Sequence, residues 1–481
     1  MDIVINLDKV MAILELPADI LVARVFLYAG WFPISIFLLW SLWRLWIFYI
    51  QNNFADKREF ILLAIDIPQG NEQSPRAVEH MFAHLAGAHA TINLIEKYWE
   101  GQTQDSFSFE IVSIEGYTQY LIQGERKYRD LIEAMVYAQY PEAEITEVND
   151  YAVSAPDRFP DENYDIWGGE WVLHKESPYP IRTYLDFEHQ FSGEFKDPDA
   201  ALIELFSSLR RGEQCWYQII VTPKGFEWEE DGYKEISKVI GEKVTSGGNV
   251  FDKAIDSMMK ALTIFSEFII PLWGEITEEE ERKEVNMQNL RPVQKKRIEA
   301  IQQKISKVGF DVKIRFIYLA AKEVFDKKRA NSFVGVMKQY TMSDLNSYKP
   351  DMDVTITSAK YLWKESRLSG RKNRLMKAYK RRSNWRGRLS GILNIEELAT
   401  LWHFPIEEAV KAPMLQKVPS RKSAAPSYLP VEGTTSDWAS EMGLADLTDG
   451  GGEKEELFSL PQASKGAVVR QTEPPANLPV G

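Results

Sequence analysis

The sequence predicts an α+β protein with a single N-terminal transmembrane helix, ferredoxin-like β-α-β-β-α-β domains with a helical insertion, and a disordered C-terminal tail. Three observations predict this class. The stretch from Val25 to Trp43 contains no charged residue, strand and helix patterns alternate between residues 58 and 350, and the end of the chain is acidic and rich in glycine. The 481 residues, 44% of them hydrophobic, suffice for two or three folded domains.

The uncharged stretch predicts a transmembrane helix at about residues 25–46, within an N-terminal segment of residues 1–50. Its nineteen residues lie between Arg24 and Arg44, and a helix of this length covers roughly 28 Å, close to the hydrocarbon thickness of a bilayer. Tryptophans favour membrane interfaces, so we expect four of them to anchor the helix: Trp31, Trp40, Trp43 and Trp46.

The cations beside the stretch indicate its orientation. Arg44, Lys57 and Arg58 follow it, whereas Lys9 and Arg24 precede it. Because cytoplasmic flanks carry the excess of lysine and arginine, we expect a single-pass protein of the cell (cytoplasmic) membrane with the bulk of the chain in the cytoplasm.

The first predicted domain, residues 58–150, follows the order of a ferredoxin-like fold. A strand is expected over residues 58–68, a helix from Pro75 to about Trp99, and a hairpin around Gly116. An amphipathic helix that ends at Pro141 and a last strand over residues 143–150 complete the pattern.

The second predicted domain, residues 151–350, repeats part of this order. The pattern predicts a strand over residues 181–189, a helix capped by Asp197 with Pro198 at its first position, and a strand over residues 214–223. A helical insertion over residues 229–307 is then followed by a strand at 311–321 and a helix that begins at Asp326.

Residues 351–410 form a basic segment followed by a short helix that begins at Asn394 and ends before Pro405. From Lys360 to Arg388 the chain has twelve basic residues and one acidic residue, with four interleaved aromatic residues. Such a cluster can bind nucleic-acid phosphates, anionic lipid headgroups or a partner protein, or be a solvated face. The expected phosphate contacts are Arg371, Lys372, Arg374, Lys377, Lys380, Arg381, Arg382, Arg386 and Arg388.

Residues 411–481 have the composition of a disordered, acidic tail. From Glu432 to Gly481 there are nine acidic and three basic residues, with glycine runs and few apolar residues. Leu457, Phe458 and Leu460 lie together in an acidic context, which is typical of a short helix that folds in a partner's groove. The alternative is an inert, solvated tail.

The sequence shows no catalytic motif, and we expect no catalytic residue, cofactor or metal site and no enzymatic activity. Neither a phosphate loop nor G-x-G-x-x-G nor G-x-S-x-G occurs. His80 and His84 lie one helical turn apart, but two histidines are too few ligands for a metal. Asp186 and Glu188 read as solvated strand residues, and Cys215 reads as a small buried hydrophobic residue.

Five segments resemble the membrane-anchored N-terminal region of type IV secretion-like or conjugation-like DNA translocation proteins: "REFILLAIDIP…SPRAVEHMF", "SFSFEIVSIEGYTQYLI", "VYAQYPEAEITEVNDY", "LMKAYKRRS" and "LNIEELATLWHFP…AAPSYLP". The resemblance covers about residues 37–430. In that family such segments precede a hexameric ATPase domain, which this chain lacks.

The resemblance therefore implies a non-catalytic membrane platform that recruits a separately encoded ATPase, with DNA or anionic lipid as further partners and a homo-oligomer as a possible assembly. Two other functions stay open at this point. One is a general membrane scaffold in envelope or pilus assembly, and the other is a nucleic-acid-binding membrane protein. A DNA-translocating ATPase would need the phosphate loop that the chain lacks.

Overall fold

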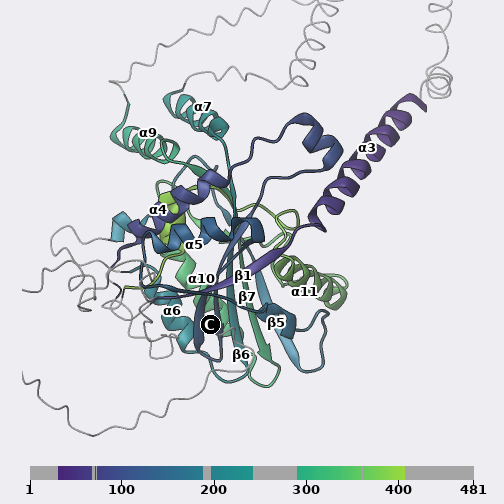
Figure 1. Cartoon of the computed structure of the whole chain (residues 1–481), viewed down its shortest axis with the longest axis vertical. Helices are drawn as coiled ribbons and strands as arrows, with labels where there is room; N and C mark the ends of the chain where they lie inside the picture. Colours follow the sequence, from purple (N-terminus) through teal and green to yellow (C-terminus); the bar gives the residue numbers. More distant parts are fainter. Residues whose placement is uncertain are drawn as a thin grey trace, which may run out of the picture.

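A computed structural model describes residues 31–67, 71, 73–187, 197–241, 290–359 and 361–406. It has the mixed α+β architecture that the sequence predicts, with one long N-terminal apolar helix and an antiparallel sheet (Figure 1). The predicted tail, with Leu457, Phe458 and Leu460, lies outside the described residues, as does Glu188.

The strands of both predicted domains lie in one sheet. Within the described residues the sheet has nine strands in the order β4-β1-β3-β2-β6-β7-β5-β8, with β9 paired to β7, and every pair is antiparallel. Strands β2 and β6 join the halves from Phe107 opposite Val221 to Ile114 opposite Gln214. The strands are β1 (Phe60–Asp66), β2 (Phe107–Ile114), β3 (Tyr117–Glu125), β4 (Glu144–Glu147), β5 (Tyr164–Leu173), β6 (Glu213–Pro223), β7 (Gly309–Ala321), β8 (Tyr348–Pro350) and β9 (Gly391–Asn394).

Helices cover both faces of this sheet because successive strand residues point to opposite sides. On β1, Leu63 belongs to the core of the first face, whereas Leu62 belongs to the core of the second. The first face packs against α4 (Pro75–Leu85), α5 (Arg129–Tyr137), α6 (Ala200–Ser207), α10 (Lys327–Lys338) and α12 (Ile395–Leu401). The second packs against α11 (Lys364–Lys380) and residues 151–159, while α7 (Glu229–Ile240) and α9 (Pro292–Ile305) pack on each other.

Several predicted local signals are confirmed. The hairpin turn has Glu115 at φ 54° and Gly116 at φ 94°, as a tight two-residue turn between strands requires. Asp326 caps α10 by accepting a hydrogen bond from the backbone N of Lys328. Asn394 begins α12, and its side chain and that of Glu397 cap each other's backbone.

The prediction of a strand over residues 181–189 is wrong. Residues Tyr184–Phe187 form a short 3₁₀ turn, and the first strand of the second half is β5, which contains Gly168 and Gly169. Paired glycines usually weaken a strand, but a Cβ at position 168 would overlap the carbonyl oxygen of Phe316 on the neighbouring strand. The glycine permits a close approach that only the paired strand reveals.

Two helix boundaries also differ from the prediction. The helix expected from Pro75 to Trp99 ends at Leu85, and a 3₁₀ turn with Gly87 follows it. Helix α6 begins at Ala200 rather than after Asp197. The carboxylate of Asp197 still accepts a hydrogen bond from the backbone N of Asp199 at 2.7 Å, and it also pairs with the buried side chain of His403, so one carboxylate serves both the local turn and a tertiary contact.

Helix α3 (Trp31–Ala55) is long and apolar enough to cross a membrane, and most of its large apolar side chains are exposed. It lies where the sequence predicts a transmembrane helix, although residues 25–30 lie outside the described part of the chain. Its four predicted anchors are exposed: Trp31, Trp40, Trp43 and Trp46.

Candidate basic surface

Helix α11 positions the basic segment on the second face of the sheet. Leu375, Met376 and Tyr379 are buried in the same core as Trp216 and Ile317. Residues three and four positions apart share one face of a helix, so this apolar stripe sets the side on which α11 packs. The cations between these positions lie on the remaining sides of the helix.

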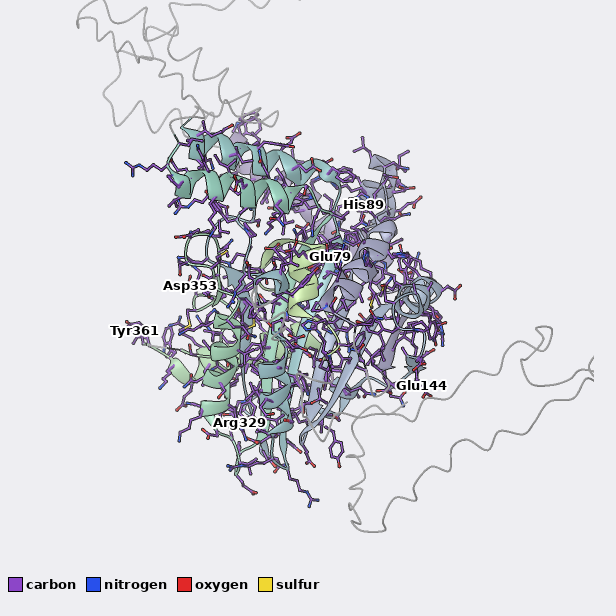
Figure 2. The ribbon with its side chains drawn as sticks, turned by 90° about the vertical axis from the view of Figure 1, so that its left-hand side faces the viewer. Glu79, His89, Glu144, Arg329, Asp353 and Tyr361 are labelled. Carbon is purple, nitrogen blue, oxygen red and sulfur yellow. The ribbon has the colours of Figure 1, made fainter. Side chains whose placement is uncertain are left out.

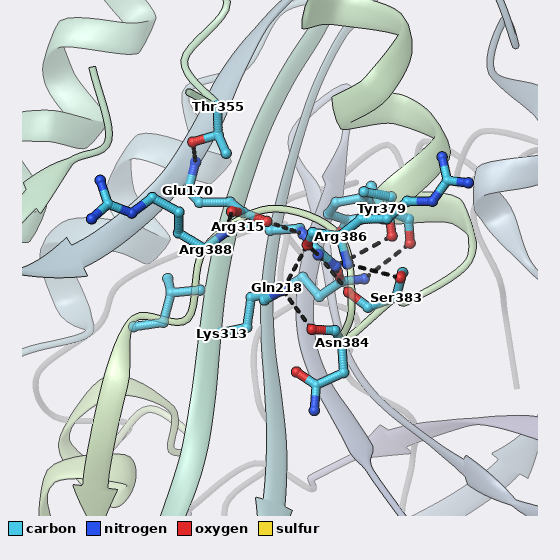
Figure 3. Close-up of polar contacts among 12 residues, drawn as sticks. Glu170, Gln218, Lys313, Arg315, Thr355, Tyr379, Ser383, Asn384, Arg386 and Arg388 are labelled. Atoms are coloured by element: carbon cyan, nitrogen blue, oxygen red, sulfur yellow. Dashed lines mark hydrogen bonds and ion pairs between the residues drawn. The ribbon is translucent and has the colours of Figure 1, made fainter. Parts of the chain in front are cut away.

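The chain continues from α11 as an irregular segment, residues 381–390, called the strap here, which crosses the polar part of the same face (Figure 3). Lys313 on β7 donates to the carbonyl oxygens of Asn384 and Arg386, both at 2.6 Å. Arg315 donates to the carbonyl oxygens of Ser383 at 2.5 Å and Arg386 at 2.8 Å. The sheet thus holds the strap by its backbone, which leaves the side chain of Arg386 exposed.

Glu170 on β5 fixes the end of the strap. Its carboxylate accepts from Arg315 Nε at 2.8 Å and from the backbone N of Arg388 at 2.5 Å. Gly387, the residue before Arg388, has φ +86°, and a Cβ at this position would overlap the Glu170 carboxylate. This position therefore requires glycine for both its conformation and its space.

Arg382, one of the predicted phosphate contacts, is buried beneath the surface. It pairs with Glu110 through Nε at 2.8 Å and with Asp150 through Nη1 at 2.6 Å. Burial alone would lower the pKa of Arg382, but the two carboxylates outweigh it and raise the pKa. Tyr151 and Gln218 also donate to Glu110. Arg382 therefore stabilises the fold from within the protein.

Some of the other predicted cations have partners within the protein, and the rest are exposed. Lys372 pairs with Asp165, and Lys380 pairs with Asp157 at 2.6 Å. Arg371 donates to backbone carbonyl oxygens, those of Met352, Asp353, Ile356 and Ser358. The exposed predicted cations are Arg374, Lys377, Arg381, Arg386 and Arg388, the last with an ion pair to Asp351 at 3.3 Å.

Two of the hollows beside α11 have several cations in their linings. One, of about 440 Å³, is lined by Asp157, Arg158, Asn373, Lys377, Lys380 and Arg381. The other, of about 340 Å³, is lined by Asp353, Val354, Ser366, Arg367, Gly370, Arg371 and Arg374. Cations make up four of the six residues that line the first hollow and three of the seven that line the second. The first hollow in particular can accept an anionic group, such as a phosphate, with charge-assisted hydrogen bonds.

Arg158 joins this surface although the sequence pattern did not indicate it. It lies more than 200 residues before α11 and outside the basic run. The amide of Asn373 on α11 brings the two segments together, because it binds both the backbone N and the carbonyl oxygen of Phe159. Only the tertiary contact identifies Arg158, since its own neighbourhood carries no basic pattern.

A second charged cluster lies in the core of the first face and has a structural role. His403 is fully buried between Asp197, at 2.9 Å, and Asp199, at 3.3 Å. Burial would lower the pKa of His403, but the two carboxylates raise it to about 9. Tyr340 also donates to Asp199. These contacts tie the segment after α12 to the start of α6.

The remaining candidates from the sequence do not converge on a site. His80 and His84 are exposed on α4, and His89 follows this helix (Figure 2). Within the described residues no three potential ligands lie close enough to hold a metal ion. Cys215 is buried on β6, as predicted, and burial raises the pKa of its thiol.

Comparison with known protein families gives a match over most of the chain. The family model of a domain of unknown function, DUF8128, matches residues 68–416, which is more than half of the chain. No curated protein matches the sequence significantly. The matched residues include the sheet from β2 onward, α11 and the strap, whereas α3 precedes them.

Proposed function

Since the chain belongs to the DUF8128 family, we propose that the shared domain is a non-catalytic platform and that helix α3 anchors it in the cell membrane. The platform recruits a separately encoded ATPase and forms part of a type IV secretion-like or conjugation-like translocation machine. The bulk of the chain lies in the cytoplasm. The observation that carries this proposal is the fixed connection between α3 and the sheet.

That connection is short and held by Arg58. Residues 56–59 link the end of α3 to β1. The guanidinium of Arg58 lies 4.7 Å from the ring of Phe54 on α3, pairs with Asp105 at 3.0 Å and donates to the carbonyl oxygen of Thr103. A charged side chain with these partners on both sides fixes the helix to the domain, which supports a platform of defined orientation.

The buried polar groups also support a scaffold role. Glu110, Glu170, Arg315 and Arg382 lie under α11 and the strap and have their partners within the protein. Fully partnered buried networks make a structure rigid and specific. A rigid sheet covered on both faces is suited to holding other proteins in place.

We also infer that the sheet is built from two ferredoxin-like units. The first four strands lie in the order β4-β1-β3-β2, and the next four, read from the other edge, lie as β8-β5-β7-β6. Each half therefore places its own strands in the spatial order 4-1-3-2, with helices α4 and α5, or α6 and α10, as the connections. The helical insertion with α7 and α9 falls between β6 and β7.

A pull-down tests the platform. The full-length protein is solubilised in detergent from its native cells, and bound proteins are identified by mass spectrometry. The comparison variant carries Leu457→Asp and Phe458→Asp, and the matched control carries Val468→Asp and Val469→Asp in the same tail. We expect an ATPase with a phosphate loop to be lost only from the first variant. Absence of any ATPase from all three samples would contradict the proposal.

A second candidate function, binding of a phosphate-bearing polymer or lipid, is favoured by the hollow that Arg158, Lys377 and Arg381 share. Lys377→Glu with Arg381→Glu should weaken binding of a labelled oligonucleotide or of anionic vesicles. For nucleic acid, the slope of log affinity against log salt should fall by about one per lost phosphate contact. The matched control is Lys327→Glu with Lys328→Glu on α10, two exposed cations outside the basic surface. Equal affinities for both variants would contradict this function.

A further inference from the structure

An exposed apolar loop lies beside the membrane helix. Residues 93–100, called the Trp99 loop here, include the helical turn Glu96–Glu100. Leu94, Ile95 and Trp99 on this loop are 74%, 69% and 74% exposed. Three large apolar side chains within six residues, all facing solvent, form an unusual surface for a soluble domain and mark an interaction site.

The loop is attached to α3 at a defined level. The ring of Tyr98 lies 5.8 Å from that of Trp43, and the ring of Trp99 lies 6.2 Å from that of Trp46. Trp46 Nε1 also donates to the carbonyl oxygen of Tyr98. Figure 1 shows this loop beside α3, at the end of the helix nearer the sheet.

The base of the loop packs tightly on the helix. Gly101, at φ +77°, lies so close to α3 that a Cβ would come within 2.5 Å of the backbone of Ile50. At the other end of the loop, Asn93 and Glu96 cap each other's backbone at 2.9 Å. Both ends of the loop are therefore fixed. The loop holds its apolar side chains in exposed positions beside α3.

The charges of the loop set its depth in a bilayer. Glu96, Lys97 and Glu100 lie on the same loop, and charged side chains are costly in the hydrocarbon region. The loop must then lie at the interface, and so must the part of α3 that it contacts, from Trp43 to Ile50. Arg44, whose guanidinium lies 5.5 Å from the ring of Trp40, falls at the same level.

We infer that the Trp99 loop is a second membrane contact, which inserts Leu94, Ile95 and Trp99 into the headgroup region of the bilayer beside α3. Interfacial elements bury their apolar side chains about 5–10 Å into this boundary. The inference rests on the proposed membrane anchorage by α3. It adds a contact that fixes the rotation of the domain about the axis of α3, because a single helix leaves this rotation free.

Site-directed fluorescence in nanodiscs tests this contact with the full-length chain. The one native cysteine, Cys215, is fully buried, so variants with one added, exposed cysteine can be labelled at that position on the folded protein, with the wild type measuring background labelling. The variants are Leu94→Cys on the loop, Leu39→Cys on α3 as the anchor control, and Ser332→Cys on the exposed side of α10 as the soluble control. Each carries an environment-sensitive dye, and nitroxide lipids quench it from the headgroup level or from deep in the acyl region.

The expected result is quenching at Leu94 that is stronger with shallow than with deep nitroxides, the opposite preference at Leu39, and no quenching at Ser332. Quenching at Leu39 together with a Leu94 signal equal to that of Ser332 would overturn the loop contact and leave the anchor intact. A lack of quenching at both Leu39 and Leu94 would overturn the anchor itself. The two failures are therefore distinguishable.

Discussion

Arg381 and Arg382 are neighbours in the chain but lie in opposite environments. Arg381 is exposed at the rim of a hollow, whereas Arg382 is buried against Glu110 and Asp150. We expect Arg382→Met to lower the free energy of unfolding by about 3–5 kcal/mol, because it leaves two carboxylates without their partner. Arg381→Met should stay within about 0.5 kcal/mol of the wild type, as exposed positions do.

Thermal or denaturant unfolding in detergent, followed by tryptophan fluorescence, measures both variants. Equal stabilities would contradict the structural role of Arg382. The sequence could not separate these two arginines, because the partner Glu110 lies on β2, 272 residues away. A basic run indicates positive charge, and the three-dimensional contacts decide which of its side chains remain available to bind a ligand.

His403 makes the stability depend on pH in a definite direction. Its pKa is raised to about 9 in the folded protein from an ordinary value near 6.5. The folded state therefore holds a proton that the unfolded state releases between these values, and stability falls as pH rises through this window. The stabilisation is fully present below pH 6.5 and amounts to roughly 3 kcal/mol, at about 1.4 kcal/mol per unit of pKa.

Lys313 opposes this trend, because burial lowers its pKa to about 8. We therefore compare the melting temperatures of the wild type and His403→Gln at several pH values from 6 to 9.5, and use the difference between them at each pH. We expect the variant to be less stable at pH 6.5 and the difference to shrink toward pH 9.5. A difference that is constant with pH would show that His403 does not carry the proton.

The strap is an element without regular secondary structure, and its path depends on Gly387. We expect Gly387→Ala to destabilise the protein by more than about 1 kcal/mol, because alanine at a positive φ is strained and here also meets Glu170. Gly370→Ala is the control, since nothing lies within 4 Å of its Cβ position on α11. In a helix this control change should be neutral or stabilise by up to about 1 kcal/mol. Calorimetry of both variants compares them.

Helix α3 is the element on which the membrane proposal depends. Replacing Leu38 and Leu39 with aspartate should release the protein from membranes, because each charge costs about 3 kcal/mol near the centre of a bilayer. The matched control is Tyr361→Asp with Leu362→Asp, an exposed pair of large side chains outside α3. Carbonate extraction followed by immunoblotting measures the membrane fraction. Carbonate-resistant association of the α3 variant would contradict the anchor.

Elements with a complete local signal could be predicted from the sequence. The hairpin between β2 and β3, the Asp326 cap and the Asn394 cap depend on residues within four positions of each other. Strand β5 could not be predicted, because Gly168 is explained by the carbonyl oxygen of Phe316. The composition of the basic run predicted a cationic surface. The contribution of Arg158 and the burial of Arg382 could be recognised only from the three-dimensional structure.

At the scale of the whole molecule, the sheet couples the two halves. The ladder between β2 and β6 is continuous over eight residue pairs, and the core of the second face contains Leu121 from the first half and Leu319 from the second. A shared core favours cooperative unfolding of both halves.

Cavity variants test this coupling. Leu121→Ala and Leu319→Ala should each lower stability by about 2–5 kcal/mol. If the sheet unfolds as one unit, each change should reduce the hydrogen-exchange protection of amides in both β1 and β7. Protection that falls only in the half carrying the substitution would show that the halves open independently.

If α3 anchors the protein as proposed, a membrane confines its copies to two dimensions, and the outer strands of the sheet then bear on how these copies meet. β4 has four residues with a glutamate at each end, and β8 has three residues and ends at Pro350. Short, charged or proline-terminated edges do not template the addition of further strands. Under that anchorage, crowding in the plane of the bilayer would not lead to fusion of sheets, and copies that meet there would recognise each other through side chains, so that their association would stay reversible.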